Sequence, residues 1–185
     1  MKRLCLLQLL VVALIWGWEG LPQASLLRAM NLRELVSASD SIVLAKVVSV
    51  QSAWDSSHRR IVSSIEIDIE QAWKGEAGSA GRTSIVQPGG TVGDIEMTVE
   101  GMPSFTPGER TLLFLHGHVH PQVVGLSQGK RTLQLDAQSG RWFVQSADMT
   151  AAYERGADAK VRHARPTSPV DLDDFRAQIE SLLRQ

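Results

Sequence analysis

Three histidines in the middle of the chain are the residues best placed to do chemistry. His116, His118 and His120 occupy alternate positions of one short segment. On an extended strand, alternate side chains point to the same face, so the three imidazoles would converge on one divalent cation. Zinc or copper is the metal that such a set of ligands favours. The alternative is that Gly117 and Pro121 mark a turn between strands, where the same histidines are simply solvated.

A glycine-rich stretch between residues 87 and 107 is the second candidate site. It is the longest irregular segment between the expected strands, and long loops on a rigid scaffold often carry binding residues. We expect it to contact a protein partner through Gly89, Gly90, Asp94 and Glu96. The two acids also form a carboxylate pair, but the sequence positions no partner group for them. The alternative is a surface loop with solvated acidic side chains.

The remaining motifs do not predict an enzyme. The segment Gly125–Thr132 resembles a phosphate-binding loop only superficially, because three residues separate its glycines where that motif needs four. Arg131 also follows Lys130 where the motif needs serine or threonine, and no helix is expected next. We therefore expect a chain without catalytic activity and without a cofactor.

The N-terminus has the pattern of a secretory signal peptide. Two basic residues precede residues 4–16, of which only Gln8 is polar. This apolar run is shorter than the roughly 20 residues that span a bilayer. We expect a signal peptide over residues 1–24, with cleavage near Ala24, and a secreted or periplasmic bacterial protein that keeps no stable membrane span. Cys5 is the one cysteine, so the mature chain would lack disulfides and thiolate metal sites.

The composition is that of a single globular domain. The chain has 185 residues, of which 43% are hydrophobic and 21% charged, and this balance excludes a wholly disordered protein. Its net charge of -1 and sequence pI of about 6.5 give no electrostatic reason to expect a nucleic-acid partner.

The elements that must position the candidate residues are mostly short strands. Ile65, Ile67 and Ile69 alternate with acidic residues, which is the period-two pattern of a half-buried strand. The apolar residues 42–50 predict a strand that is buried on both faces. Further strands are expected over residues 83–87, 110–115 and 142–144, and one more is interrupted by a bend at residues 127–130, with residues 123–126 and 132–135 on its two sides. Five or six short strands with glycine-rich turns predict a mainly β fold, as an antiparallel barrel or sandwich.

Helices are expected on either side of these strands. Asn31 and Glu34 have the spacing of a capping box, which predicts a short N-terminal helix. Residues 146–169 are polar and alanine-rich, and we interpret them as a linker. Over residues 170–185, apolar positions at helical spacing follow several aspartates, which predicts a C-terminal amphipathic helix that packs on the strands.

Three segments resemble a known family. Residues 38–50, the strand that ends Trp73-Lys74-Gly75, and residues 107–115 are similar to the netrin-like domain of tissue inhibitors of metalloproteinases. The resemblance covers roughly Leu32 to Leu115 and implies an OB-fold, here a barrel over residues 31–145. In that family an N-terminal cysteine chelates the protease zinc. The mature chain would have no cysteine, so the resemblance implies the fold but not the zinc-chelating N-terminus that inhibits the protease.

A second resemblance concerns exported bacterial proteins to which no activity is assigned. They share a Gln-Pro-Gly-Gly loop and a Gly-Leu-x-Gln-Gly-Lys strand, matched here by Gln87–Gly90 and Gly125–Lys130. The leading hypothesis is an exported, non-catalytic module that binds a protein partner through loops of the barrel. One alternative is a metal-binding envelope protein or metal-dependent enzyme centred on the three histidines. The other, which rests on the resemblance alone, is a protease inhibitor.

Overall fold

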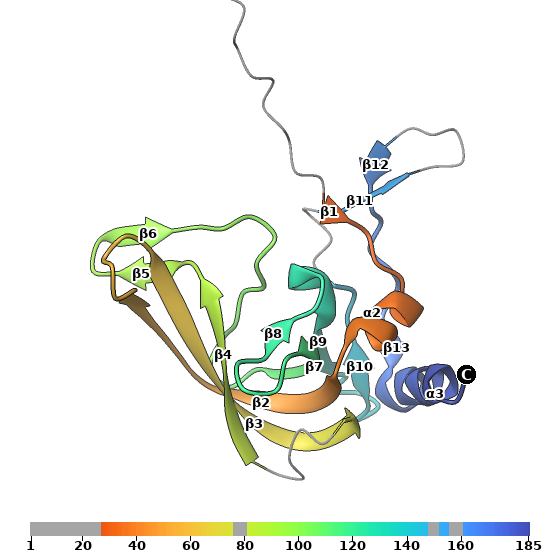
Figure 1. Cartoon of the computed structure of the whole chain (residues 1–185). Helices are drawn as coiled ribbons and strands as arrows, with labels where there is room; N and C mark the ends of the chain where they lie inside the picture. Colours follow the sequence, from red (N-terminus) through yellow and green to blue (C-terminus); the bar gives the residue numbers. More distant parts are fainter. Residues whose placement is uncertain (1–26, 76–80, 148–151, 156–160) are drawn as a thin grey trace, which may run out of the picture.

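The computed structural model describes residues 27–75, 81–147, 152–155 and 161–185 (Figure 1). The expected signal peptide over residues 1–24 lies outside these residues. No helix within the described parts is long and apolar enough to cross a membrane. The chain is mainly β, as predicted, with two short α-helices.

One antiparallel sheet of eight strands makes up most of the molecule. Seven of its strands follow the order β13-β10-β9-β7-β2-β3-β4, and β8 pairs with β7 beside this path. The strands are β2 (Ser41–Trp54), β3 (Ile61–Lys74), β4 (Gly81–Pro88), β7 (Arg110–His116), β8 (Gln122–Val123), β9 (Lys130–Leu135), β10 (Trp142–Val144) and β13 (Val170–Asp171).

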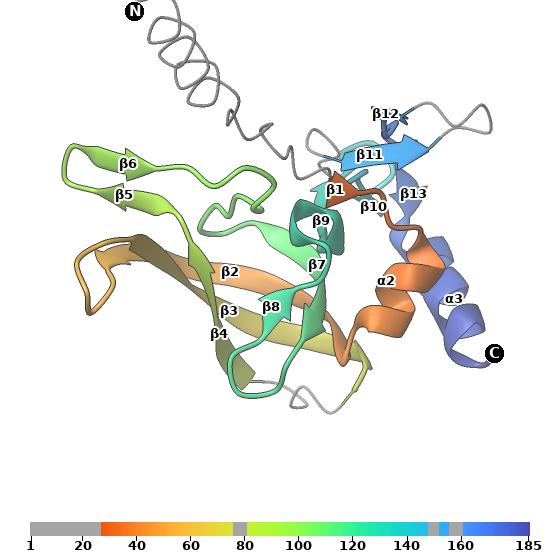
Figure 2. The same cartoon turned by 45° about the horizontal axis from the view of Figure 1, so that its top comes forward.

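The two longest strands, β2 and β3, bend strongly and give the sheet its curvature (Figures 1 and 2). Their pairing contains register shifts between Ile42 and Val43, between Leu44 and Ala45, and between Val47 and Ser49. Such bulges bend a strand and increase its twist. The period-two prediction for β3 is confirmed, because its isoleucines are buried while the acidic residues between them are partly or fully exposed.

Each face of the sheet buries its own apolar core. Ile42, Leu44 and Phe114 belong to the core that the helices cover. Val43, Val47 and further residues of β3, β4 and β7 form the second core on the concave face. The prediction that residues 42–50 are buried on both faces is confirmed for the first half of β2, because alternate residues there belong to the two cores.

Both predicted helices are present and pack against each other and the first core. The capping box at the start of α2 (Leu32–Ala38) forms, since Asn31 and Glu34 exchange backbone and side-chain hydrogen bonds of 2.9 Å. Helix α3 spans Leu172–Leu183 and is capped by the carboxylate of Asp171. Its start differs from the expected residue 170, because Val170–Asp171 form strand β13 at the edge of the sheet.

Three other expectations need correction. A closed barrel is not seen, since β4 and β13 end the strand order and the sheet has eight strands, not five or six. The expected linker contains β11 (Ala152–Arg155) and β12 (Val161–His163), which form a small sheet with β1 (Leu27–Arg28). The expected irregular stretch contains the hairpin of β5 (Gly90–Val92) and β6 (Ile95–Met97).

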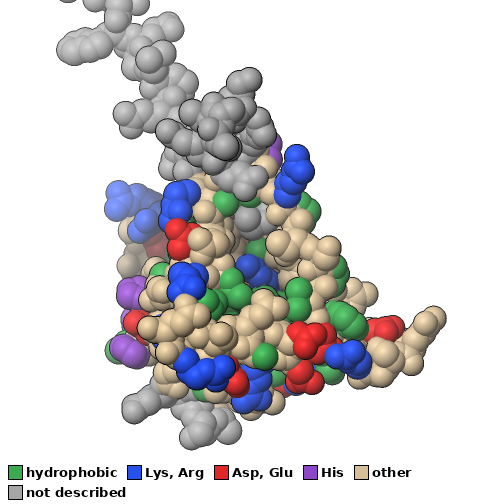
Figure 3. Space-filling view, turned by 90° about the vertical axis from the view of Figure 1, so that its right-hand side faces the viewer, with side chains coloured by type: hydrophobic (Ala, Val, Ile, Leu, Met, Phe, Trp, Pro, Cys, Tyr) green, Lys and Arg blue, Asp and Glu red, His purple; other side chains and the backbone are tan. Residues whose placement is uncertain are grey.

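A buried ion pair holds residues 103–109 over the concave core. The Nζ of Lys130 lies 2.7 Å from Oε1 of Glu109 and donates to the backbone oxygen of Ser104 at 2.5 Å. It also lies 4.7 Å from the ring centroid of Phe105, which packs on the concave core. The segment therefore closes one side of the curved sheet. On the opposite, helix-bearing side, acidic, basic and apolar side chains are intermixed (Figure 3).

Candidate functional site

The β5–β6 hairpin projects from the body of the molecule beside the far end of β2 and β3 (Figures 1 and 2). Its two-residue turn has Gly93 at the first central position with φ of +59°, a place where hairpin turns favour glycine. Asp94, Ile95 and Glu96 are all exposed, and Ile95 leaves 54% of its surface in solvent. An exposed branched apolar side chain between two carboxylates is thus presented at the tip.

The base of the hairpin is held by buried polar contacts. Gly89 donates its N–H to the oxygen of Ile61 at 2.9 Å and accepts from the hydroxyl of Ser63 at 2.6 Å. Gly90 has φ of +130°, and a Cβ there would collide with the hydroxyls of Ser52 and Ser63, so only glycine fits. The four predicted contact residues therefore divide by role: Gly89 and Gly90 anchor the hairpin, whereas Asp94 and Glu96 are exposed on it.

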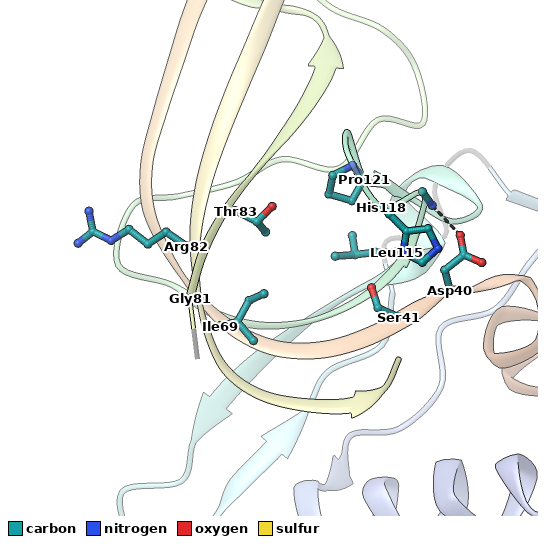
Figure 4. Close-up of a pocket in the computed structure, with 10 residues that line it drawn as sticks. Asp40, Ser41, Ile69, Gly81, Arg82, Thr83, Leu115, His118 and Pro121 are labelled. Atoms are coloured by element: carbon teal, nitrogen blue, oxygen red, sulfur yellow. Dashed lines mark hydrogen bonds between the residues drawn. The ribbon is translucent and has the colours of Figure 1, made fainter. Parts of the chain in front are cut away.

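A cavity of about 490 Å³ opens at the other end of β4, between that strand and the turn that joins β7 to β8. We call it the seam cavity, because it lies where the curved sheet does not close (Figure 4). It is lined by Asp40, Ser41, Ile69, Gly81, Arg82, Thr83, Leu115, Gly117, His118 and Pro121.

The walls of the seam cavity combine apolar side chains with the hydroxyls of Ser41 and Thr83. Figure 4 shows Thr83 and Ile69 on one side of the cavity and Ser41 and Leu115 on the other, while Arg82 points away. Ile69 is 6% and Leu115 is 2% exposed. Ser41 is 7% exposed, and no buried polar side-chain atom of the described residues is left without a hydrogen-bond partner.

Asp40 fixes the turn that forms one wall of the cavity. Its Oδ2 accepts the N–H of Gly117 at 2.7 Å and lies 2.9 Å from Nδ1 of His116. The hydrogen bond from Gly117, followed by the charges of His116 and His118, lowers the pKa of the Asp40 carboxyl. Oδ2 of this carboxylate is therefore occupied by the protein's own groups.

The three histidines do not share one strand face. His116 ends β7, and Gly117 then takes φ of +91°, so His118 and His120 lie in the turn with exposed side chains. Over the part of the chain that the structure describes, no group of three or more histidine, cysteine, aspartate or glutamate residues is arranged to hold a metal ion. The segment is therefore a turn, as in the alternative interpretation of the sequence. Of these three histidines, His118 lines the cavity and the other two do not.

One serine has a setting that the sequence analysis overlooked. Ser127 stands in Gly-x-Ser-x-Gly, the spacing of the nucleophile elbow of hydrolases. That motif needs an exposed serine between a strand and a helix. Here Ser127 is 4% exposed, sits in the short 3₁₀ helix Leu126–Gly129, and is followed by strand β9. The segment is a buried turn, so the motif match does not make it a catalytic site.

The residues of the seam cavity could not be recognised as a group from the sequence. Ser41 and Thr83 lie far apart in the chain and belong to no motif. They face each other only because β2, β3 and β4 are neighbours in the sheet.

In comparisons with known proteins, no family model, curated protein or solved structure matches the chain. The netrin-like resemblance therefore remains a prediction.

Proposed function

We propose that this chain is an exported, non-catalytic binding module that engages a protein partner through the β5–β6 hairpin. The observation that carries the proposal is the exposed Ile95, which lies between two exposed carboxylates on an anchored hairpin. Apolar anchors with a polar surround supply much of the affinity in protein interfaces. Because buried contacts already order the base of the hairpin, binding would cost less conformational entropy than binding by a free loop.

Two finer assignments belong to the same proposal. Export is supported by the signal pattern of residues 1–24 and would bring the hairpin to partners in the bacterial envelope or outside the cell. An OB-like origin of the sheet is supported by its antiparallel pairing and by the strong bend of β2 and β3. Neither assignment is needed for the hairpin to bind.

Site-specific photo-crosslinking tests the proposal. A photoreactive residue replaces Ile95 in the mature chain, and the matched control carries it at Leu135, which is 48% exposed on β9. Both proteins are irradiated with envelope and culture-supernatant proteins of the source organism. We expect a discrete adduct from position 95 alone, and we expect unlabelled chain to compete it away while Asp94→Lys/Glu96→Lys does not. Equal products from both positions, or none from position 95, would contradict the proposal.

A further inference from the structure

We infer that the seam cavity binds the lysine side chain of an extended segment of another protein, and that this segment pairs with the free edge of β4. The site lies apart from the β5–β6 hairpin, so the inference goes beyond the proposed function and does not depend on it. The edge of β4, the apolar walls of the cavity and the carboxylate of Asp40 carry it.

The first feature is the free edge of β4 beside the cavity. Among the described strands, β4 pairs only with β3, and its residues Gly81, Arg82 and Thr83 line the cavity. In an antiparallel edge strand, every second residue directs its N–H and C=O away from the sheet. A Cβ added to Gly81 would meet no atom within 4 Å, so the described residues leave room beside this end of the strand. An extended segment can therefore add a strand here while one of its side chains enters the cavity, which is a common mode of peptide recognition.

The second feature is the apolar lining of the cavity. Ile69 and Leu115 line it together with Pro121, and Figure 4 shows the first two on opposite walls. The volume of about 490 Å³ is far larger than the roughly 30 Å³ that one water molecule takes up in the liquid. The cavity thus has room for a long side chain, and its walls suit the methylene stem of such a side chain better than a short polar group.

The third feature is a carboxylate with one oxygen available to a ligand. The hydrogen bond from Gly117, followed by the charge of His116, lowers the pKa of the Asp40 carboxyl, so the group is ionised at neutral pH. These two neighbours hold Oδ2, whereas Oδ1 makes no hydrogen bond with a described residue, and the side chain is 35% exposed. A single oxygen suits the compact ammonium of lysine, whereas the fork of an arginine is best matched by both oxygens of a carboxylate.

The cations closest to this carboxylate are engaged elsewhere. Lys74 donates its ammonium protons to the backbone oxygens of Val36 and Ser39, at 2.7 and 2.6 Å. Arg82 points away from the cavity (Figure 4) and lies 3.4 Å from a carboxylate oxygen of Glu66. An ammonium group that enters the cavity therefore meets the free carboxylate oxygen without displacing either side chain.

The lysine comes from a different protein and not from a second copy of this chain. The lysines that the structure describes are Lys46, Lys74 and Lys130. They lie in β2, β3 and β9, and each of these strands is paired on both sides within the main sheet. A described lysine of a second copy could reach the edge of β4 only if that sheet came apart.

Titration of the isotope-labelled mature chain with short blocked peptides, followed by NMR, tests the inference. The probe is the peptide acetyl-Thr-Val-Lys-Val-Thr-amide, and its match has norleucine in place of lysine, which keeps most of the stem and removes the charge. At pH 8 the histidines of the wall add little positive charge. We expect the lysine peptide to shift the amide signals of Gly81–Thr83 and to bind at least about tenfold more tightly than the norleucine peptide. An arginine peptide should bind more weakly than the lysine peptide, and a glutamate peptide should not bind.

Two methylated peptides test the pairing with β4. One carries N-methyl groups on the two valines, and the other carries them on the lysine and both threonines. In an added strand, alternate N–H groups face the sheet and the others face away. We therefore expect one of these peptides to bind like the parent and the other to bind at least about tenfold more weakly.

A protein variant tests the carboxylate. Asp40→Asn keeps an oxygen that accepts the N–H of Gly117 but removes the charge, so it should bind the lysine and norleucine peptides alike. Asp68→Asn, the matched control at an exposed position of β3, should bind the lysine peptide like the wild type.

The comparison of peptides on the wild-type chain keeps the inference open to refutation even if Asp40→Asn folds poorly. Equal affinity for the lysine and norleucine peptides, equal losses from the two methylated peptides, or no shift at Gly81–Thr83 up to roughly ten millimolar peptide would overturn the inference. None of these measurements involves the hairpin, so crosslinking at position 95 can fail or succeed independently of them.

Discussion

Replacing Lys130 with methionine should destabilise the fold more than any surface substitution. The side chain of Lys130 is 9% exposed and that of Glu109 is 16% exposed, with 2.7 Å between Nζ and Oε1. Lys130→Met keeps the aliphatic volume but leaves the Glu109 carboxylate with the backbone N–H of Thr106 as its one remaining partner among the described residues. Breaking a buried pair by removing one partner costs about 3–5 kcal/mol. We expect about 3 kcal/mol here, since Glu109 keeps some exposure.

Urea denaturation followed by tryptophan fluorescence measures this cost, and a double-mutant cycle assigns it to the pair. Glu109→Gln retains an acceptor for Thr106, so the double variant Lys130→Met/Glu109→Gln removes the unpaired charge without removing that hydrogen bond. The double variant should be more stable than the sum of the single effects implies, by about 1–3 kcal/mol. Strictly additive losses, or a loss below about 1 kcal/mol for Lys130→Met, would refute the view that this pair holds residues 103–109 over the concave core.

Three further predictions follow from named contacts. Gly90→Ala should cost about 2–3 kcal/mol of unfolding free energy in urea titrations, since it combines positive φ with a collision, whereas Gly81→Ala, which meets nothing within 4 Å, should be nearly neutral. The N–H of Arg59 and the hydroxyl of Ser57 lower the pKa of Asp55 to about 2. Because this folded pKa lies below the unfolded value of 3.8, the contribution of Asp55 to the free energy of unfolding is present above pH 4 and disappears as the pH falls toward 2. Asp55→Asn should flatten the stability profile in that window, and carboxyl NMR titration checks the pKa itself. Zinc titration calorimetry of the untagged chain should show no site tighter than about millimolar, and a micromolar site would mean that the histidine turn rearranges.

Local sequence patterns predicted the elements that depend on near neighbours. The alternation at Ile65–Glu70 located β3, and the spacing of Asn31 and Glu34 located the start of α2. In both cases a short segment determines which side chains are buried or which backbone groups are capped. Of the two interpretations of the histidines, the shared strand face was wrong for a local reason as well, because Gly117 adopts positive φ and the strand ends at His116.

The candidate sites could not be predicted because they depend on pairing between distant segments. Gly90 is required by its contact with Ser52 and Ser63, which lie on β2 and β3. The small sheet that contains β11 forms because the chain just before α2 pairs with it in parallel. The sequence of residues 146–169 has no periodicity that would indicate pairing with the segment before α2. This stretch was therefore interpreted as a linker.

The two edge strands of the main sheet, β13 and β4, differ in how they are protected, and the least protected part lies at the seam cavity. Edge strands are usually protected, since their free N–H and C=O groups invite another chain to pair. β13 is only two residues long, which limits pairing at that end of the sheet. β4 is protected at Pro88, which has no N–H, and at Gln87, whose side chain donates to the oxygen of Pro103 at 2.9 Å. At Gly81–Thr83 the edge has no proline and none of the described side chains bonds across it, and these residues border the cavity. Strand addition needs free backbone N–H and C=O groups at an edge and a pocket for a side chain, and among the described strands this end of β4 combines the two.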